Sequence, residues 1–416
     1  MKLKKFIKLI PAFILSIFSI TLFASVPNTT TTTVAAEENS CISYNSQANE
    51  IFISCKNVQF KDIANSLEDQ NILYRESDNV LEKDWILKAG ITVNKDATLN
   101  IDSDDVTWLK IVPGSAQPNA INVDGSLNID SVKITSWDPQ KNDYVHFSEA
   151  TKYDELQYMK ELRPYIKVNS GATGPTTIQN SELAYLGYSC NGCGGVSFNG
   201  GDYSVLKNND IHHIYKGFYS KGMGYMLIEG NRVHDNHKYG IDPHSGTHDM
   251  LIINNIVYDN FNAGIICSAD CYNILIEGNK VYNNGHGDNM RGIAVSRNVF
   301  DSIIKNNIIY NEDKCISIGR NSFNNHIYEN TMSTCIYGVY ITKDSFENKI
   351  HDNHIETVGI GLVAASNSNN NDFHSNTLTD VKIQPTLQDS TSTNNNFDTN
   401  KKIVSFDTLK EEKGIK

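Results

Sequence analysis

The segments IEGNRVHDNHKYGID (228–242) and IINNIVYDNFNAGII (252–266) decide the fold, because each is an imperfect copy of the other. In both, an Asn is followed two residues later by Val, and nine residues after that Asn a Gly precedes an Ile. The Asn recurs along the chain at spacings of 22 to 29 residues. The aligned positions are Asn180, Asn209, Asn231, Asn255, Asn279, Asn307, Asn330, Asn353 and Asn376. Two landmarks in one register identify an internal repeat.

This repeat predicts an all-β fold, a right-handed parallel β-helix built as a solenoid of coils of about 23 residues. Short β-branched segments between Asn, Asp and Gly residues are typical of strands joined by tight corners. One coil is too small to bury its apolar face alone, so it must stack on its neighbours. The repeated Asn fits a ladder of side-chain amides along the stack, and Asn tolerates left-handed backbone. A leucine-rich repeat has a similar period, but its Leu-x-x-Leu-x-Leu skeleton is absent.

The two ends of the chain differ from the repeat. Four lysines near the start precede an uncharged apolar run, so we assign residues 1–36 to a signal peptide and a Thr-rich spacer. Residues 37–90 form an N-terminal region without a recognisable pattern, 91–380 form the β-helix, and 381–416 form a C-terminal cap and charged tail. The charged stretch 138–162 interrupts the repeat and is expected to be an excursion loop. We expect a secreted or cell-envelope protein with no membrane segment beyond the export signal.

The net charge of −12 bears on the partners of the protein. An acidic chain is a poor match for nucleic acid, since phosphate contacts need Lys and Arg in quantity. An acidic polysaccharide needs only a local basic strip. The charge therefore argues against nucleic acid as a partner and leaves an anionic polysaccharide open.

All eight cysteines follow the signal segment, and an even number in an exported chain indicates disulfides. The pairs closest in sequence are Cys41 with Cys55, Cys267 with Cys271, and Cys315 with Cys335. We interpret Cys190-Asn-Gly-Cys193 as a disulfide or two free thiols, with a redox or metal-binding pair as the alternative.

Stacking converts the repeat into a spatial alignment of outward side chains. Because side chains alternate along a strand, the residue after each inward aliphatic residue points outward. One predicted outward column is Tyr219, Asp242, Ile266, Ala294, Ser317 and Tyr340. A second column, two residues further along each strand, is Lys221, His244, Ser268, Ser296, Gly319 and Thr342. The corner that follows contributes Arg297, Arg320 and Lys343.

These columns predict a binding strip for an anionic chain that lies along the axis of the solenoid. The substrate-binding candidates are its aromatic and basic members, Tyr219, Lys221, Arg297, Arg320, Tyr340 and Lys343. The alternative is that these outward charges only solvate one face of the solenoid.

The segment VHDNHKYGIDPHSGTH (233–248) contains four of the 12 histidines of the chain, together with Tyr239 and Asp242. This concentration indicates a general acid–base site. A metal site is the competing interpretation, because His and Asp are also metal ligands. We favour the acid–base site and predict no metal ligand and no cofactor, although an acidic exported protein allows a structural Ca²⁺.

At YGIDPH (239–244) the sequence resembles the mannuronan C5-epimerases, which are alginate-modifying β-helix enzymes, and among them the periplasmic type. Further matches occur in the same order, and the likeness covers about residues 120–330. They are SWD (136–138), RPYI (163–166), LGY (186–188), GFY (217–219), GIAVSRN (292–298) and NSFNN (321–325).

The resemblance implies roles for the site residues. The proton-abstracting His of the family, just upstream of its Asp-Pro-His motif, corresponds to His237, and the neighbouring Tyr corresponds to Tyr239. The motif itself supplies Asp242 and His244. The family also neutralises the uronate carboxylate with a cation, for which Arg291 is the nearest candidate. These five residues are the predicted catalytic set.

The implied function is an exported enzyme whose partner is an anionic polysaccharide, a polyuronate, and which converts mannuronate to guluronate residues in an alginate-like polymer. We expect it to be a monomer. Loss of the C5 proton leaves an enolate-like dianion, so a cation and a base with a near-neutral pKa are both needed. If the 4-O-linked sugar leaves instead, the same site is a lyase. A non-catalytic carbohydrate-binding or surface β-helix is the other alternative. Two departures from the family pattern favour it: Ser245 replaces an acidic residue and Met290 a basic one.

Overall fold

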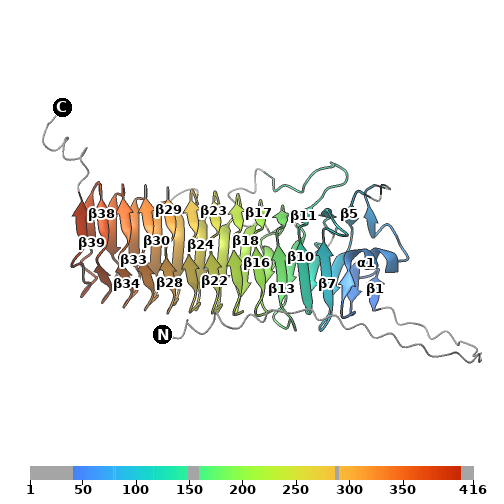
Figure 1. Ribbon diagram of the computed structural model, residues 1–416, viewed down its shortest axis with the longest axis horizontal. Helices are drawn as coiled ribbons and strands as arrows, with labels where there is room; N and C mark the ends of the chain where they lie inside the picture. The colour runs from blue at the N-terminus through green and yellow to red at the C-terminus, as the bar shows by residue number, and fades with distance from the viewer. Residues whose placement is uncertain are drawn as a thin grey trace, which may run out of the picture. The chain divides into compact units, whose positions relative to one another are not determined.

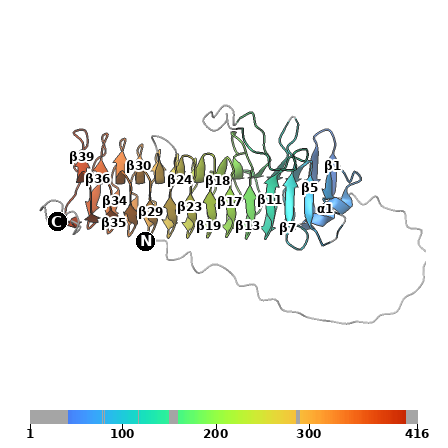
Figure 2. The same ribbon diagram turned by 90° about the horizontal axis from the view of Figure 1, so that it is seen from above.

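Three parallel sheets, one for each side of a coil, make up the computed structural model (Figure 1, Figure 2). The structure describes residues 41–77, 79, 81–115, 117–148, 159–285 and 290–403, so the predicted signal peptide and spacer lie outside the described residues. Within these ranges, no helix is long and apolar enough to cross a membrane. The parallel β-helix predicted from the repeat is confirmed.

Each coil contributes one strand to each sheet in turn, as β18, β19 and β20 do before β21 returns to the first sheet. Sheet A contains β1 (Ile42–Asn45), β2 (Glu50–Ile53), β6 (Gly90–Val93), β9 (Ala120–Val123), β12 (Tyr165–Val168), β15 (Gly195–Phe198), β18 (Lys216–Lys221), β21 (Tyr239–His244), β24 (Ala263–Ser268), β27 (Arg291–Ser296), β30 (Lys314–Gly319), β33 (Tyr337–Thr342), β36 (Ile360–Ala364) and β39 (Gln384–Gln388). Sheet B contains β3 (Val58–Gln59), β7 (Thr98–Asp102), β10 (Ser126–Asp130), β13 (Thr176–Gln179), β16 (Val205–Lys207), β19 (Leu227–Glu229), β22 (Leu251–Ile253), β25 (Leu275–Glu277), β28 (Ile303–Lys305), β31 (His326–Tyr328), β34 (Lys349–His351) and β37 (Asp372–His374). Sheet C contains β4 (Leu73–Arg75), β5 (Asp84–Leu87), β8 (Trp108–Ile111), β11 (Lys133–Ser136), β14 (Glu182–Ala184), β17 (Asp210–His212), β20 (Arg232–His234), β23 (Ile256–Tyr258), β26 (Lys280–Tyr282), β29 (Ile308–Tyr310), β32 (Thr331–Ser333), β35 (His354–Glu356), β38 (Thr377–Thr379) and β40 (Lys401–Ile403).

The core is a set of aliphatic columns inside the coils. In sheet A, Ile241, Ile265 and Ile293 pair in register from strand to strand, and all three are fully buried. Val233, Val257 and Val281 do the same in sheet C. Burial of such columns supplies the hydrophobic stabilisation that a single coil lacks.

The predicted Asn ladder is present at the corner between sheets B and C. Along it, each Asn Nδ2 donates to the Oδ1 of the Asn one coil further on, for example from Asn231 to Asn255 at 2.9 Å. Two details of the prediction are corrected. Ser181, not Asn180, occupies the ladder position, since the Ser181 amide donates to Asn209 Oδ1. The left-handed backbone belongs to the residue before each ladder Asn, as at Asn254 with φ of 56°.

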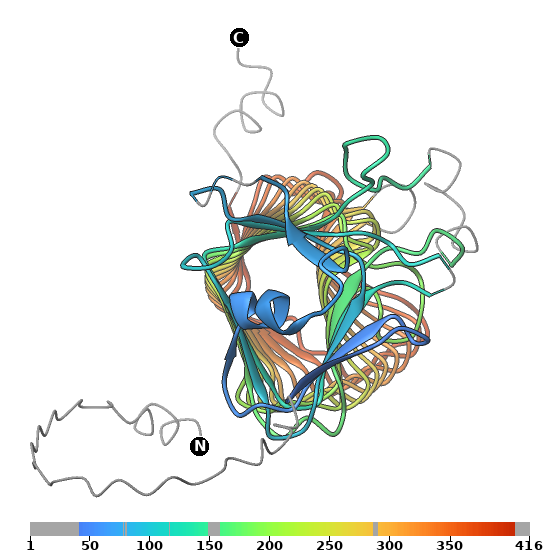
Figure 3. The same cartoon turned by 90° about the vertical axis from the view of Figure 1, so that its right-hand side faces the viewer.

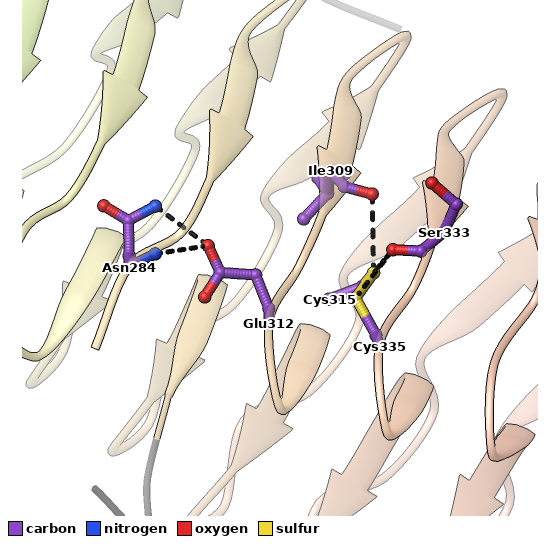
Figure 4. The surroundings of a disulfide bond; sticks show 6 residues. All are labelled: Asn284, Ile309, Glu312, Cys315, Ser333 and Cys335. Atoms are coloured by element: carbon purple, nitrogen blue, oxygen red, sulfur yellow. Dashed lines mark hydrogen bonds between the residues drawn. A yellow bond between two sulfur atoms is a disulfide. The ribbon is translucent and has the colours of Figure 1, made fainter. Parts of the chain in front are cut away.

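A second ladder, at the corner between sheets C and A, ends on a carboxyl group (Figure 4). It runs from Asn236 through Asn260 and Asn284 to Glu312. Glu312 Oε1 accepts from both the backbone N–H and Nδ2 of Asn284, while its buried Oε2 has no hydrogen-bond partner. Burial raises the pKa of Glu312 to about 8, although the bonds from Asn284 lower it. A neutral carboxyl therefore terminates the ladder at pH 7.

The described part of the predicted region 37–90 joins the sheets. Strand β2 pairs in parallel with β6, whereas β1 and β2, and β4 and β5, form antiparallel pairs. The short helix α1 (Phe60–Ser66) buries Phe60, Ile63 and Ala64 against the end of the core (Figure 3). This helix covers apolar side chains that the first coil would otherwise expose.

Three disulfides link six of the eight cysteines. Cys41 pairs with Cys55 and Cys315 with Cys335, as predicted, and Cys190 pairs with Cys193 (the second pair is in Figure 4). The expected bond between Cys267 and Cys271 is wrong, because both thiols are free and buried. Cys267 lies in the tightly paired strand β24, and Cys271 Sγ donates instead to the Ser268 carbonyl, 3.2 Å away.

The excursion predicted at 138–162 is described at its two ends, up to residue 148 and from residue 159. Tyr144 stacks on Tyr185 with ring centroids 4.3 Å apart. At the far end, the fully buried Arg163 donates to the carbonyls of Leu186 and Gly187. These contacts fix both ends of the excursion beside the corner between sheets C and A.

Candidate active site

The outward columns predicted from the repeat match the register of sheet A. Tyr219 pairs with Asp242, and Lys221 with His244, between β18 and β21. Further along, Ile266, Ala294, Ser317 and Tyr340 continue the first column. Ser268, Ser296, Gly319 and Thr342 continue the second. One face of sheet A therefore carries the Tyr, Asp and His side chains that the sequence singled out.

Asp242 is a buried carboxylate that faces a lysine. Its side chain is 1% exposed, and Oδ2 lies 3.4 Å from Lys216 Nζ. Its Oδ1 is buried and has no hydrogen-bond partner. Burial raises the pKa of Asp242 to about 6, against the lowering effect of Lys216, Lys238 and Arg297. Asp242 is thus mainly ionised at pH 7 and holds the Lys216 ammonium next to it.

His244 is half-buried at the end of the same strand, beside Tyr219, with ring centroids 5.7 Å apart. Its Nδ1 lies 2.5 Å from Ser245 Oγ. Burial, and then the charges of Lys216, Arg297 and Lys221, lower the pKa of His244 to about 4. The imidazole is therefore neutral at pH 7 and has a nitrogen lone pair available to take up a proton.

Lys216 and Lys238 are site residues that the sequence reasoning missed. Lys216 Nζ lies over the Tyr219 ring at 4.1 Å and near the Tyr239 ring at 5.9 Å. Lys238 Nζ lies 5.7 Å from the Tyr239 ring centre. A signal for Lys216 exists: it directly precedes the small-aliphatic landmark Gly217-Phe218, as Tyr239 precedes Gly240-Ile241. The predicted columns began after this landmark and so left out the outward position before it.

Tyr239 and Arg291 also begin strands of sheet A, with Ala263 between them in register. Tyr239 packs on an apolar patch of Ala263, Ile266 and Ala294. Arg291 is half-buried, and burial lowers its pKa while Tyr239 raises it. The phenol and the guanidinium therefore lie within electrostatic range of each other on one face.

His237 occupies the corner between sheets C and A. Its backbone N–H donates to the Ile214 carbonyl at 2.9 Å, and its ring packs edge-to-face on Phe147 with centroids 4.7 Å apart. Phe147 in turn lies 3.6 Å from the Arg163 guanidinium carbon. His237 thus contacts the excursion loop beside the strand that carries Asp242 and His244, and its role as the base stays a prediction.

The other two histidines of the segment 233–248 lie elsewhere. His234 is in sheet C, where Nε2 contacts Asp210 Oδ1 at 2.9 Å and Nδ1 contacts Asp235 Oδ2 at 2.7 Å. His248 lies beyond the corner between sheets A and B and stacks on Tyr272. The histidines that are close together in the sequence therefore lie on different faces of one coil, because a coil turns through three sheets.

The remaining predicted binding residues follow the corner after sheet A. Arg297, Arg320 and Lys343 are exposed, with left-handed φ of 67°, 55° and 56°. They stack in register, since the Arg297 amide donates to the Gly319 carbonyl just before Arg320. Among the described residues, no group of three or more His, Cys, Asp or Glu side chains is arranged to hold a metal ion.

Comparisons with known proteins agree with the fold and with the predicted resemblance. A family model described as right handed beta helix region matches residues 165–299, and one described as periplasmic copper-binding protein (NosD) matches residues 262–407. The sequence relatives are mannuronan C5-epimerases. That of Pseudomonas aeruginosa is 27% identical over 39% of this chain, and that of Pseudomonas fluorescens is 29% identical over 30% of it. These matches span 30% and 24% of the two relatives.

Solved structures show the same architecture over most of the described chain. The periplasmic alginate epimerase AlgG superposes with a TM-score of 0.72 over 86% of this chain and 85% of that structure, at 20% identity. The A-module of the Azotobacter vinelandii mannuronan C-5 epimerase AlgE6 superposes with a TM-score of 0.56 over 77% of this chain and 88% of that module, at 16% identity. These likenesses, with the right-handed family model, establish a right-handed parallel β-helix.

Proposed function

We propose that this protein is an exported enzyme that inverts C5 of uronate residues in an anionic polysaccharide, with mannuronate in an alginate-like polymer as the substrate. The observation that carries the proposal is the face of sheet A, where strands β18, β21 and β27 carry a neutral imidazole, a buried carboxylate, a phenol and two cations. The names of the relatives support the choice of reaction and polymer. The names of the relatives, and the signal segment, support export.

The proposed reaction begins with transfer of the C5 proton to a base. His244 is the proposed base, because it is neutral at pH 7 on the strand that carries Asp242. Its pKa of about 4 in the free protein is set by burial and by neighbouring cations, and the carboxylate of a bound uronate raises that pKa toward neutral. The electrons of the broken C–H bond move into the carboxylate, which becomes an enolate-like dianion. Lys216, held in place by Asp242, is the proposed cation for that charge, and Arg291 lies on the other side of Tyr239 along the sheet.

Tyr239 is the proposed acid that returns a proton to the opposite face of C5. It lies next to Lys216 and Lys238, so a phenolate formed in this step is stabilised by two ammonium groups. His237, at the adjacent corner, is the alternative base. The same intermediate loses its 4-O-linked sugar in a lyase, so the reaction outcome must be measured.

The test is incubation of the full protein with polymannuronate in D₂O. An epimerase incorporates deuterium at C5, produces guluronate signals in the proton NMR spectrum, and generates no ultraviolet absorbance from an unsaturated product. Absorbance without guluronate identifies a lyase. Polymer binding with neither outcome, across several uronans, contradicts both enzymes and supports a non-catalytic carbohydrate-binding β-helix.

A further inference from the structure

A second cluster of a lysine and two tyrosines lies further along the same face of sheet A. Lys314 Nζ is 5.9 Å from the ring centre of Tyr337 and 5.6 Å from that of Tyr340. The two tyrosine rings contact each other edge-to-face, with centroids 4.9 Å apart. Strands β30 and β33, which carry them, lie four strands beyond β18 and β21. At about 4.8 Å per strand, this is a separation of about 19 Å.

The two clusters occupy equivalent positions of the coil. Lys314 begins its strand as Lys216 does, and Tyr337 begins the next strand as Tyr239 does. Tyr340 stands where the first cluster has Asp242. The position of His244 corresponds to Thr342, which cannot take up a proton at neutral pH. The second cluster therefore has the cation and aromatic rings of the first without its carboxylate and its imidazole.

Lys314 carries a charge that the described part of the protein does not neutralise. It makes no ion pair within 4.0 Å with any described residue, and its side chain is only half-exposed. Burial, and then the neighbouring Arg291, lower the pKa of Lys314, which Asp313 raises. Two cations held close together at a partly desolvated surface favour an anion between them.

The tyrosines of this cluster rest on an apolar patch of Ile360, Val363 and Ala365. Their position is thereby fixed, with the lysine above them. Sugar rings present C–H groups to aromatic side chains while their carboxylates seek cations, and this cluster offers both contacts.

Between the two clusters, Arg291 stands in the column that runs from Tyr239 through Ala263 to Lys314. The next outward column contains Ile266, Ala294 and Ser317, and the one after it contains Ser268, Ser296 and Gly319. A polymer that contacts both clusters thus meets no charged or aromatic side chain in these last two columns along β24, β27 and β30, and it passes one further cation, Arg291.

We propose that Lys314, Tyr337 and Tyr340 form a second carboxylate-binding subsite, which holds a uronate residue of the same polymer chain about four strands from the residue that reacts at His244. The proposal rests on the proposed function for the identity of the polymer. It assigns the second cluster to binding alone and makes long chains better substrates than short ones.

The test uses oligomannuronates of increasing length with the wild-type protein, Lys314→Gln and a matched control, Lys280→Gln. Lys280 also lies near two tyrosine rings, at 5.3 Å from Tyr282 and 5.7 Å from Tyr310, but in sheet C. Each variant removes one lysine charge beside two rings. We expect the ratio of kcat/KM between long and short oligomers to fall about tenfold in Lys314→Gln, as for loss of one charged hydrogen bond. The ratio stays at the wild-type value in Lys280→Gln.

An unchanged ratio in Lys314→Gln, or an equal fall in both variants, overturns the subsite while leaving the proposed reaction intact. If the wild-type protein turns over no uronan, affinity electrophoresis in gels that contain polymannuronate tests the subsite separately. Weaker retardation of Lys314→Gln than of Lys280→Gln then supports it, and equal retardation overturns it. Circular dichroism confirms that each variant is folded.

Discussion

His234 and His244 come from the same coil, and the structure gives them opposite chemistry. In sheet C, His234 is held between Asp210 and Asp235 and stacks between His212 and Tyr258. Although burial lowers it, the hydrogen bonds to the two carboxylates raise the pKa of His234 to about 9. In sheet A, His244 lies among cations, and its pKa falls to about 4.

The difference between the two histidines indicates which sheet of the solenoid suits the proposed reaction. The sheet C imidazole is charged at pH 7, and both of its nitrogens are engaged by carboxylates, so it serves the stability of the stack. The sheet A imidazole is neutral and lies beside a buried carboxylate and a lysine. The proposed chemistry is therefore confined to the face where neighbouring strands place a lysine and a buried carboxylate beside the histidine.

The largest expected effect comes from removing the sheet A imidazole. His244→Ala should reduce deuterium incorporation at C5 by at least about a hundredfold, because general base catalysis contributes on that scale. His234→Ala should keep most of the activity. His237→Ala decides between the two candidate bases, and full loss there with activity retained in His244→Ala would reverse the assignment.

The rate of deuterium exchange at C5 should depend on pH through the protonation of Asp242. Since burial raises its pKa to about 6, the carboxylate takes up a proton as the pH falls through 6 and no longer holds Lys216. We expect kcat/KM to decrease below about pH 6 while circular dichroism reports a folded protein. A rate that is constant from pH 7 to pH 5 would remove Asp242 from this role.

The stability of the stack should depend on Glu312. Its pKa is raised in the folded state to about 8, so the folded form holds this proton more tightly than the unfolded chain. Stability is therefore lost as the pH rises from about 4.5 to 8. Glu312→Gln keeps an acceptor for Asn284 without the ionisation, so its Tm should exceed that of the wild type by several degrees at pH 9 and match it at pH 5.

Thermal unfolding followed by circular dichroism at both values of pH checks this prediction. Glu347→Gln, at an exposed turn, is the matched control and should change Tm little at either pH. If the difference in Tm between Glu312→Gln and the wild type is no larger at pH 9 than at pH 5, the ladder does not end on a neutral carboxyl.

The contribution of His234 to the stability of the protein should also decrease as the pH rises. A His whose folded-state pKa is raised to about 9 stabilises the protein fully below its unfolded pKa of about 6.5 and loses this effect as the pH rises through 9. His234→Ala should thus lower the free energy of unfolding by about 1 to 3 kcal/mol at pH 6. An equal difference between the two proteins at pH 6 and pH 10, in urea titrations, would contradict the paired imidazolium.

The smallest expected effect is on the titration of His244 itself. Lys221 is one of the cations that lower its pKa, so Lys221→Gln should raise that pKa slightly. An NMR titration of the imidazole, assigned by comparison with His244→Ala, measures the change. Lys280→Gln, in sheet C, should leave the His244 titration where it is.

The sequence was sufficient for the coil and for most of the sheet A face, because strand periodicity and repeat spacing are local properties. It predicted that Tyr219 aligns with Asp242 and Lys221 with His244. It missed Lys216, because the predicted columns left out the outward position that directly precedes each small-aliphatic landmark. It also grouped His234 and His248 with the site, because closeness in sequence does not show where a coil turns into the next sheet.

Two further features depend on packing that the repeat does not encode. Cys267 and Cys271 are close in sequence, yet both thiols stay free in the core. The pKa of His244 depends on Lys216, Arg297 and Lys221, which come from coils before and after it. Such long-range charges become visible only once the coils are stacked.

A crystal structure of the protein with bound oligomannuronate tests the central claim most directly. We predict that the sugar chain lies along sheet A, with C5 of one residue within reach of the His244 imidazole, its carboxylate facing Lys216, and a later carboxylate facing Lys314. An oligosaccharide bound on sheet B or sheet C, or held on sheet A with C5 far from both His244 and His237, would contradict it.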